Sequence, residues 1–529
     1  MTSNFNMTLW TTFLKSLVSE GYCGEVQTEQ SVSYLKNVSQ FVREIGPVLI
    51  PKNTSDILLI VKLANRDKIP LYPFSRGKNW GFGSRLPVTN NSVLVDLSKL
   101  NKIREINIEY GYAVVEAGVS QQELALKLKE MKAPFYLDVT GSGTDTSIIG
   151  NSLERGIAYN SLRVDMISNL EVVLGDGTFL KTGLGCFGDS EVNNLYPHGV
   201  GPGLHHLFFQ SNFGIVTAAT IKLNRYHSFI TDFKISFNDA NLSPVFDQIK
   251  TLKQIGIIKS ICRTGDFARS YETMAPLLTK EYEKIGINMT PSELLTRYKK
   301  YNRFEWTCFG KIDGEPEEVE FKKKQIENKL SKLAKVEFYT ENKIQRLTKI
   351  FYFLKRWDQY CNLKASESLR LLSIGVPTDD ALKITFWDQT QIKTQVNFSS
   401  DVDDSPIGFL LIVPLCPFKG DHVNNFVLQA RTISTKYKVD LGITLNTISD
   451  TIIEGVISLK FKSAQSGHQC MLDLYEKFSS LGYWPYRLNI DIMDKFIRPT
   501  ESFWIVVKKI KSILDPNSII ARERYDSRL

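Results

Sequence analysis

The chain has 529 residues, of which 43% are hydrophobic, 23% charged and 11% aromatic, and its formal net charge is +8. Its length predicts at least two domains at roughly 100–200 residues each, and its composition is that of an ordinary globular protein. The basic residues are scattered among nearly as many acidic ones. This balance argues against a nucleic-acid-binding tail and supports at most a mild attraction to anionic ligands.

The cysteines and histidines form no metal-binding or disulfide pattern. The seven cysteines include no C-x-x-C pair, and the six histidines include no H-E-x-x-H motif. The odd cysteine count and the wide spacing favour neither a disulfide framework nor a zinc site. His205 and His206 are adjacent, so on a helix they would point about 100° apart. We therefore expect no bound metal.

The N-terminal residues 1–22 lack a basic segment followed by a long apolar run. They predict a short amphipathic helix rather than a signal peptide. No stretch reaches the roughly 18 consecutive apolar residues that a membrane-spanning helix needs. We expect a cytoplasmic protein with neither a membrane nor a nucleic acid as its partner.

Strand and helix signals alternate through the first 225 residues. An apolar strand (46–50) ends at Pro51, a helical period follows over 54–68, and a second strand spans 69–74, which predicts a βαβ-like unit. The later elements in this region are expected to be strands over 92–100 and 112–119, a helix with a capping box from Ser120 to Glu123, a hairpin turning at Asp176-Gly177, and a β-rich run over 213–223.

The pattern changes after about residue 225. Long Lys- and Glu-rich helical stretches, such as 315–336, alternate with strand-like runs at 407–415 and 450–461. This mixture predicts a second α+β domain. Near the end, a helical pattern stops at Asp515-Pro516. We therefore expect boundaries that divide the chain into residues 1–225, 226–481 and 482–529.

Two glycine-rich stretches need to be told apart. GLGCFG (183–188) matches G-x-G-x-x-G, but no convincing helix follows it, and position 203 is a glycine rather than an acidic residue. A dinucleotide site needs both, so we interpret this stretch as an ordinary loop. PFSRGKNWGFGS (73–84) follows a strand instead, and its glycines allow the backbone N–H groups to form a nest for phosphate oxygens.

Arg76 and Lys78 add positive charge to this first loop. It lacks the G-K-[ST] ending of a Walker A loop, and a tight turn beside an aromatic cluster is the alternative interpretation. A second stretch, VTGSGTDTSIIGNSLERG (139–156), offers Thr146 and Ser147 as caps for a helix whose N–H groups would face an anion. Two anion-binding loops fit an extended diphosphate ligand.

Taken together and in order, these segments resemble the flavoprotein superfamily of vanillyl-alcohol oxidase and p-cresol methylhydroxylase. The resemblance is close over about 45–225 and 482–521, and weak in between. The segments that carry it are 73–84, 93–124, 137–159, 170–185, 196–223, 482–490 and 514–521. It implies an α+β protein whose FAD-binding domain (PCMH-type, two α/β subdomains) is built from the N-terminal part and the C-terminal segment, with an α+β substrate (cap) domain inserted between them.

The resemblance also implies which residues would hold FAD. The first loop would supply backbone amides to the pyrophosphate, the second stretch would line its other side, and two residues of a later strand would meet the adenosine end. The implied cofactor residues are Pro73, Phe74, Ser75, Arg76, Gly77, Lys78, Asn79 and Trp80; Thr140, Gly141, Ser142, Ser147, Gly150, Asn151, Glu154 and Gly156; Ile215 and Val216; and Arg487.

Arg487 matches the family arginine beside the flavin N1/O2 edge, where a fixed positive charge stabilises negative charge on the reduced cofactor. Tyr486 and Tyr159 match tyrosines of the family's phenol-binding pocket. For each, simple packing with one satisfied hydrogen bond is the alternative interpretation. Tyr486 is the best candidate for orienting or deprotonating a substrate hydroxyl. Arg487, Tyr486 and Tyr159 are thus the expected catalytic residues.

Several positions depart from the family pattern. Some members tether FAD through a histidine in the first loop, where this chain has Asn79, and others through a His or Tyr in a cap strand that here carries Glu454 and Gly455. We therefore predict dissociable FAD. Phe82 replaces a tyrosine that helps to hold a phenolate, and Thr140, Gly141 and Ser142 stand where members carry an acidic residue, with Asp145 displaced. A simple para-alkyl phenol is therefore not the expected substrate.

The resemblance implies a flavin enzyme that transfers a hydride from a small organic substrate, aromatic or a specialised metabolite, to flavin N5, with O2 as the expected electron acceptor. Two alternatives stay open: a dehydrogenase with another acceptor, and a flavin-binding subunit without catalysis. A homodimer is a further option that the family suggests. The substrate itself does not follow from the sequence, because the cap domain is the least recognisable part.

Overall fold

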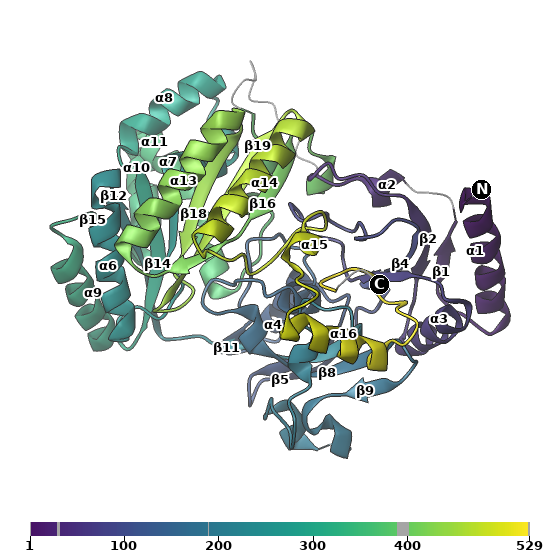
Figure 1. Ribbon diagram of the computed structural model, residues 1–529. Helices are drawn as coiled ribbons and strands as arrows, with labels where there is room; N and C mark the ends of the chain where they lie inside the picture. The colour runs from purple at the N-terminus through teal and green to yellow at the C-terminus, as the bar shows by residue number, and fades with distance from the viewer. Residues whose placement is uncertain (1, 29–31, 189, 389–400, 527–529) are drawn as a thin grey trace.

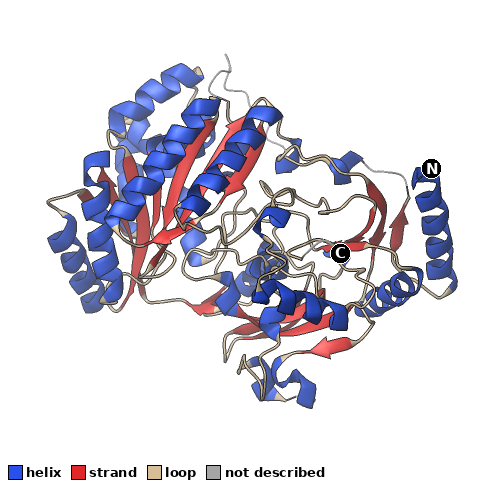
Figure 2. Ribbon diagram, viewed as in Figure 1, coloured by secondary structure: helices blue, strands red, loops and turns tan. Residues whose placement is uncertain are grey.

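The computed structural model describes residues 2–28, 32–188, 190–388 and 401–526, and its strands form four sheets in this part of the chain (Figures 1 and 2). The first sheet has the order β1-β2-β4-β3, with β2 and β3 parallel to β4. Its strands are β1 (Glu25–Gln27), β2 (Ile45–Ile50), β3 (Leu71–Phe74) and β4 (Ser92–Asp96). Helix α3 (Thr54–Asp67) joins β2 to β3. The predicted βαβ unit is therefore present, with β4 between its two strands.

The second sheet is antiparallel, with the order β5-β6-β10-β8-β9. Its strands are β5 (Ile103–Asn107), β6 (Tyr112–Glu116), β8 (Ile167–Leu174), β9 (Phe179–Lys181) and β10 (Gly214–Lys222). The hairpin predicted at Asp176-Gly177 joins β8 to β9. The predicted capping box is also confirmed, because Ser120 and Glu123 cap α4 (Gln121–Glu130) reciprocally.

The third large element is an eight-stranded sheet with the order β15-β12-β14-β13-β18-β19-β16, in which β17 pairs with β19. Its strands are β12 (Phe229–Phe237), β13 (Arg263–Asp266), β14 (Trp306–Gly314), β15 (Lys335–Tyr339), β16 (Gly408–Ile412), β17 (Leu415–Pro417), β18 (Asp440–Asn446) and β19 (Ile452–Phe461). All of them come from residues 229–461, and we call this unit the cap sheet.

Helices cover the cap sheet on both faces (Figure 1). One face carries α6 (Leu242–Gln254), α9 (Pro316–Leu330), α13 (Gly420–Tyr437) and α14 (Ala464–Ser480). The other carries α7 (Phe267–Lys284), α8 (Pro291–Tyr301), α10 (Glu341–Phe353) and α11 (Trp357–Ala365). Side chains alternate between the two faces of a strand. Each cap strand therefore points every second side chain toward α6, α9, α13 and α14, and the remaining ones toward α7 and the interior of the molecule.

The C-terminal segment returns to the first sheet. After α16 (Ser502–Leu514), the Leu71 N–H donates to Ile519 O and the Ala521 N–H donates to Leu71 O, each at 2.7 Å. The yellow end of the chain in Figure 1 accordingly lies beside the purple N-terminal strands. Residues far apart in sequence thus share one sheet edge, in line with the proposed three-part division of the chain.

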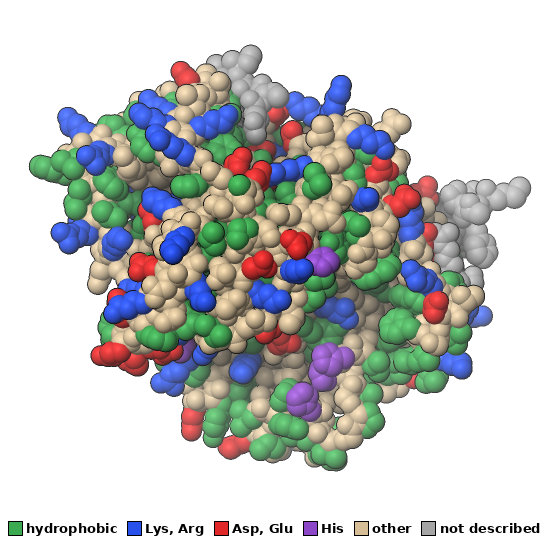
Figure 3. Space-filling view, turned by 60° about the vertical axis from the view of Figure 1, so that its left-hand side comes forward, with side chains coloured by type: hydrophobic (Ala, Val, Ile, Leu, Met, Phe, Trp, Pro, Cys, Tyr) green, Lys and Arg blue, Asp and Glu red, His purple; other side chains and the backbone are tan. Residues whose placement is uncertain are grey.

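The remaining elements are short or peripheral. They are α1 (Thr2–Ser19), α2 (Val32–Leu35), β7 (Phe135–Tyr136), α5 (Ile148–Leu153), β11 (Asn224–Arg225), α12 (Glu367–Leu371) and α15 (Met493–Phe496). Within the described ranges, none of the helices combines the length and apolar character needed to cross a bilayer. On the face shown in Figure 3, acidic and basic side chains are interspersed rather than gathered by sign.

Candidate active site and cofactor cavity

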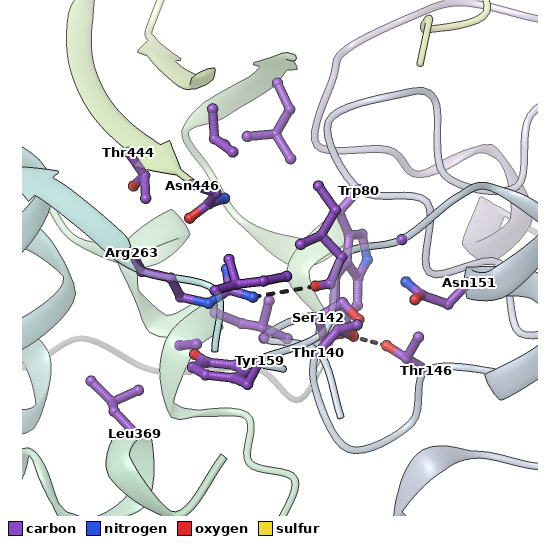
Figure 4. A pocket seen from close by; sticks show the side chains of 18 of the residues that line it. Trp80, Thr140, Ser142, Thr146, Asn151, Tyr159, Arg263, Leu369, Thr444 and Asn446 are labelled. Carbon is purple, nitrogen blue, oxygen red and sulfur yellow. Dashed lines mark hydrogen bonds between the residues drawn. The ribbon is translucent and has the colours of Figure 1, made fainter. Parts of the chain in front are cut away.

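A cavity of about 1020 Å³ lies where the first two sheets, the C-terminal segment and the α7 face of the cap sheet meet. Every residue predicted to bind cofactor or substrate lies on its wall: Pro73, Phe74, Ser75, Arg76, Gly77, Lys78, Asn79, Trp80, Phe82, Thr140, Gly141, Ser142, Ser147, Gly150, Asn151, Glu154, Gly156, Tyr159, Ile215, Val216, Tyr486 and Arg487. Figure 4 shows cap residues such as Arg263 and Asn446 on one side, facing Trp80, Thr140 and Asn151 on the other.

The first loop is shaped by glycine. Gly77 has φ +65°, which L side chains rarely adopt, and it turns the chain directly after β3. The second stretch approaches this loop closely, because a Cβ at Gly150 would lie 2.3 Å from Ser75 Oγ. A side chain at position 150 would therefore displace the Ser75 hydroxyl and crowd the Ser147 hydroxyl that caps α5. Glycine at this position leaves room for both hydroxyls where the two loops meet.

Arg76 and Lys78 of the first loop pair with carboxylates of this chain, whereas we expected their charge to be available to a phosphate group. Arg76 pairs with Glu123 at 2.8 Å and with Asp145 at 2.7 Å, and Lys78 lies 3.3 Å from Asp401. Carboxylates of this chain therefore offset the positive charge that we expected to attract phosphate. The same contacts explain the displaced Asp145, whose carboxylate pairs with the loop cations instead of lining the cavity.

The second stretch is fixed by its own polar side chains. Ser147 caps α5 by accepting a hydrogen bond from the Gly150 N–H, as predicted, and it donates to Ala117 O. Thr146 does not cap this helix, because its hydroxyl donates to Ser142 O at 2.6 Å (Figure 4). This bond ties residues 142–146 into a compact turn at the cavity wall.

Arg487 is held by residues from both halves of the cavity wall. Its Nη2 donates to the Asn79 side-chain oxygen, and its Nε lies 3.3 Å from a Glu154 carboxylate oxygen. Its guanidinium carbon is 4.5 Å from the centroid of the Phe82 ring, a cation–π distance. Glu154 also pairs with Arg524. A partly buried cation is thus fixed at one point of the cavity by a carboxylate, an amide and an aromatic face.

Glu454 is a further residue of the site. In the sequence it was noted only because it stands in the strand where some family members carry the His or Tyr that binds FAD covalently. It is 2% exposed, lies on the cavity wall with Tyr486, and accepts a hydrogen bond from Asn446 Nδ2 at 2.7 Å. Burial raises the pKa of its carboxyl, and its hydrogen bonds partly oppose that rise. The signal available in the sequence was an acidic residue between the apolar residues Ile453 and Val456 of strand β19.

The Tyr486 hydroxyl is held in its protonated form. Burial and the neighbouring Glu454 raise its pKa well above the ordinary value. This tyrosine therefore acts as a hydrogen-bond donor at neutral pH. The Glu454 carboxyl of strand β19 lies next to this hydroxyl. A group that can accept a proton and a group that can donate a hydrogen bond are therefore neighbours on the cavity wall.

Tyr159 lies beneath an arginine that the sequence reasoning missed. The Arg263 guanidinium carbon is 4.2 Å from the Tyr159 ring centroid, and its Nη2 donates to Ala158 O at 2.7 Å (Figure 4). Burial raises the pKa of the Tyr159 hydroxyl. A Cβ at Gly141 would lie 3.7 Å from this hydroxyl, so Tyr159 faces the stretch that was expected to meet the flavin.

Residues 46–183 match the family model described as an FAD binding domain. Two curated proteins are similar over nearly the whole chain. A 1'-carboxy-chondrochloren decarboxylase from Chondromyces crocatus is 28% identical over 95% of both chains, and the flavoprotein subunit of a 4-cresol dehydrogenase [hydroxylating] from Pseudomonas putida is 24% identical over 94% of this chain and 92% of its own. The matched domain and these two relatives support the resemblance to the p-cresol methylhydroxylase and vanillyl-alcohol oxidase superfamily of flavoproteins.

A solved structure agrees in fold. The 4-ethylphenol oxidase from Gulosibacter chungangensis superposes with a TM-score of 0.83 over 98% of both chains at 21% identity. The predicted α+β architecture with a PCMH-type FAD-binding domain is thereby confirmed. The chain is a flavoenzyme, and FAD is its cofactor.

The residues present fit this cofactor. Trp80 Nε1 and Asn151 Oδ1 are buried on the cavity wall and have no hydrogen-bond partner among the described residues, which suits a polar ligand between the two loops (Figure 4). The cavity wall as described contains no histidine and no cysteine. GLGCFG (183–188) forms a 3₁₀ turn away from this wall, which agrees with its interpretation as an ordinary loop. In the described part of the chain, no three His, Cys, Asp or Glu side chains are grouped so that they could hold a metal ion.

Proposed function

We propose that this flavoprotein oxidises a small organic substrate at a C–H bond. Bound FAD supplies the two-electron acceptor. The observation that carries the proposal is the meeting of Tyr486, Glu454 and Arg487 in one cavity with the glycine loops. Tyr486 would donate a hydrogen bond that orients a substrate hydroxyl, and Glu454 would accept its proton. Arg487 would provide the fixed cation beside the cofactor.

The division of roles between Tyr486 and Glu454 follows from their pKa values. Tyr486 was the sequence-based candidate for either orienting or deprotonating the substrate. Its raised pKa keeps it protonated at neutral pH, so it has no negative charge with which to accept a proton. The pKa of the Glu454 carboxyl is instead raised from its ordinary value of 4.5 by burial. A base works best with a pKa near the operating pH. The carboxylate therefore suits proton acceptance and the tyrosine suits orientation.

We retain O2 as the proposed electron acceptor, with a different acceptor as the alternative. The purified yellow protein is mixed anaerobically with a panel of para-substituted phenols and their carboxylated counterparts, and loss of flavin absorbance identifies the substrate. Air or an artificial one-electron acceptor is then admitted. If air reoxidises the reduced flavin as fast as substrate reduces it, the protein is an oxidase. If air reoxidises the flavin slowly and the artificial acceptor does so quickly, the protein is a dehydrogenase. Bound flavin that no compound reduces would contradict the proposed function.

We propose that the FAD is not covalently bound. The first-loop position used as a tether by some relatives is Asn79, which accepts a hydrogen bond from Arg487, and the facing strand β19 (Ile452–Phe461) carries Glu454 and no His or Tyr. After acid precipitation, the yellow colour is expected in the supernatant. A pellet that keeps the colour after washing, with a protein mass increased by that of FAD, would overturn the proposal.

The substrate is proposed to be larger or more polar than a simple para-alkyl phenol. Phe82 has no hydroxyl, and its ring instead packs against the Arg487 guanidinium at 4.5 Å. Tyr486 and Tyr159 keep their hydroxyls on the wall, and the cap domain adds Tyr298, Tyr301 and Tyr339. The panel therefore includes compounds with a second polar group.

A further inference from the structure

Two arginines of the cap face the cavity with buried nitrogens that have no partner. Arg263 Nε and Arg269 Nη1 are both shielded from solvent, and neither has a hydrogen-bond partner among the described residues. Both residues line the cavity, Arg263 from strand β13 and Arg269 from the first turns of α7. Leaving a buried cationic donor unpaired is costly, so such donors ordinarily have a ligand or a carboxylate to satisfy them.

The nearby carboxylates of the cap have other partners. Burial raises the pKa of Glu454 and the charge of Arg263 opposes that rise, but the Glu454 carboxylate accepts its hydrogen bond from Asn446. Asp266 caps α7 by accepting the backbone N–H of Arg269 at 2.8 Å, and burial raises its pKa to about 6. Glu272 forms a buried ion pair with Lys460 at 2.7 Å. Both contribute only a longer-range attraction to Arg269. The guanidinium is therefore not neutralised by direct pairing with either acid.

Arg263 and Arg269 act on the same point of the wall. The Arg263 guanidinium lies over the Tyr159 ring at 4.2 Å, and the stem of Arg269 packs against Gly265 of the same strand, β13. Both charges oppose the upward shift that burial imposes on the pKa of the Tyr159 hydroxyl. Arg263 is fixed there by its bonds to Ile157 O and Ala158 O, which leave Nε unused. Strand alternation explains the placement, because Cys262 and Thr264 face the helix layer of α6 and α13 while Arg263 faces the cavity.

We propose that Arg263 and Arg269 form a carboxylate-binding subsite, so that the substrate of this enzyme carries a carboxylate held beside Tyr159. The subsite rests on the proposed function, since it assigns a second polar group to the molecule oxidised in this cavity. A planar carboxylate matches the fork of guanidinium donors better than other common anionic groups of its size. The name of the Chondromyces crocatus relative, a decarboxylase acting on a 1'-carboxy compound, is consistent with such a substrate class.

The test measures equilibrium binding to the oxidised holoenzyme, which requires no turnover. The probes are para-hydroxyphenylpropanoate and its primary amide, which share one shape and differ in charge. Binding is followed by the shift of the flavin absorbance and by calorimetry. The wild type is expected to bind the acid about tenfold to a hundredfold more tightly than the amide. In Arg269→Gln and in Arg263→Gln, this preference is expected to fall below about threefold.

Three controls keep the result interpretable. Arg269→Lys keeps the charge and is expected to restore part of the preference, and Arg297→Gln removes an exposed arginine that pairs with Asp358 outside the cavity and is expected to change nothing. The melting temperature and flavin content identify any variant that fails to fold. Equal binding of acid and amide, an unchanged preference in both Gln variants, or no binding of the acid would overturn the subsite. The anaerobic reduction screen tests the proposed function separately.

Discussion

Replacing Arg487 by alanine is expected to slow the reduction of bound FAD by substrate about a hundredfold to a thousandfold, the usual cost of removing one preorganised electrostatic donor. In this structure the guanidinium is fixed by Asn79, Glu154 and the Phe82 ring, so it needs no reorganisation during the reaction. Its positive charge favours the negative charge that builds up on the cofactor as the substrate is oxidised. The alanine variant loses that charge entirely.

The fold is expected to tolerate this change, because Glu154 keeps its second cation, Arg524. FAD content is measured by absorbance after gel filtration, and the reduction rate by anaerobic stopped-flow with the substrate found in the screen. Arg498→Ala is the matched control, since this exposed arginine of the same C-terminal segment stacks on Trp484 outside the cavity. A full reduction rate in Arg487→Ala would remove this residue from the mechanism.

Glu454→Gln is expected to reduce the rate of FAD reduction about a hundredfold to ten-thousandfold, the range that general-base catalysis contributes. Gln keeps a side-chain oxygen that can accept the hydrogen bond from Asn446, but it cannot accept a proton from the substrate. In the wild type, the rate should rise with pH as Glu454 loses its proton, with a midpoint above the ordinary value of 4.5 because burial disfavours the charged form. This acidic limb should be missing in the variant.

The folding stability of the Glu454→Gln variant should not decrease together with its activity. The folded state holds the Glu454 proton more tightly than the unfolded chain does, so stability from this group is present below 4.5 and is lost as pH rises through the higher folded pKa. A neutral Gln avoids that loss, and the melting temperature at pH 7 should not fall. Glu337→Gln, at another part of the cavity wall and paired with Lys335 at 3.0 Å, is the control. A Glu454→Gln variant with full rate and an intact acidic limb would contradict the assignment.

Local patterns were sufficient to predict the individual elements. The capping box at Ser120, the hairpin at Asp176-Gly177 and the Ser147 cap depend on contacts within a few residues, and the structure contains all three. Thr146 was assigned the wrong role, since its hydroxyl donates to Ser142 O instead of capping α5. The competing acceptor was created by a turn geometry that composition does not reveal.

The sequence by itself determined the flavoprotein class, because glycine positions and short motifs report directly on the backbone that surrounds a cofactor. It did not determine the substrate side of the cavity. Arg263, Asn446 and Glu454 come from three separate strands of the cap sheet, and their meeting depends on strand order and on which face each side chain takes. Likewise, the sequence of the first loop does not reveal that Arg76 and Lys78 pair with carboxylates. Those carboxylates belong to Glu123, Asp145 and Asp401. Charge on a side chain can be read from the sequence, but its neutralisation depends on which distant residues the fold brings within reach.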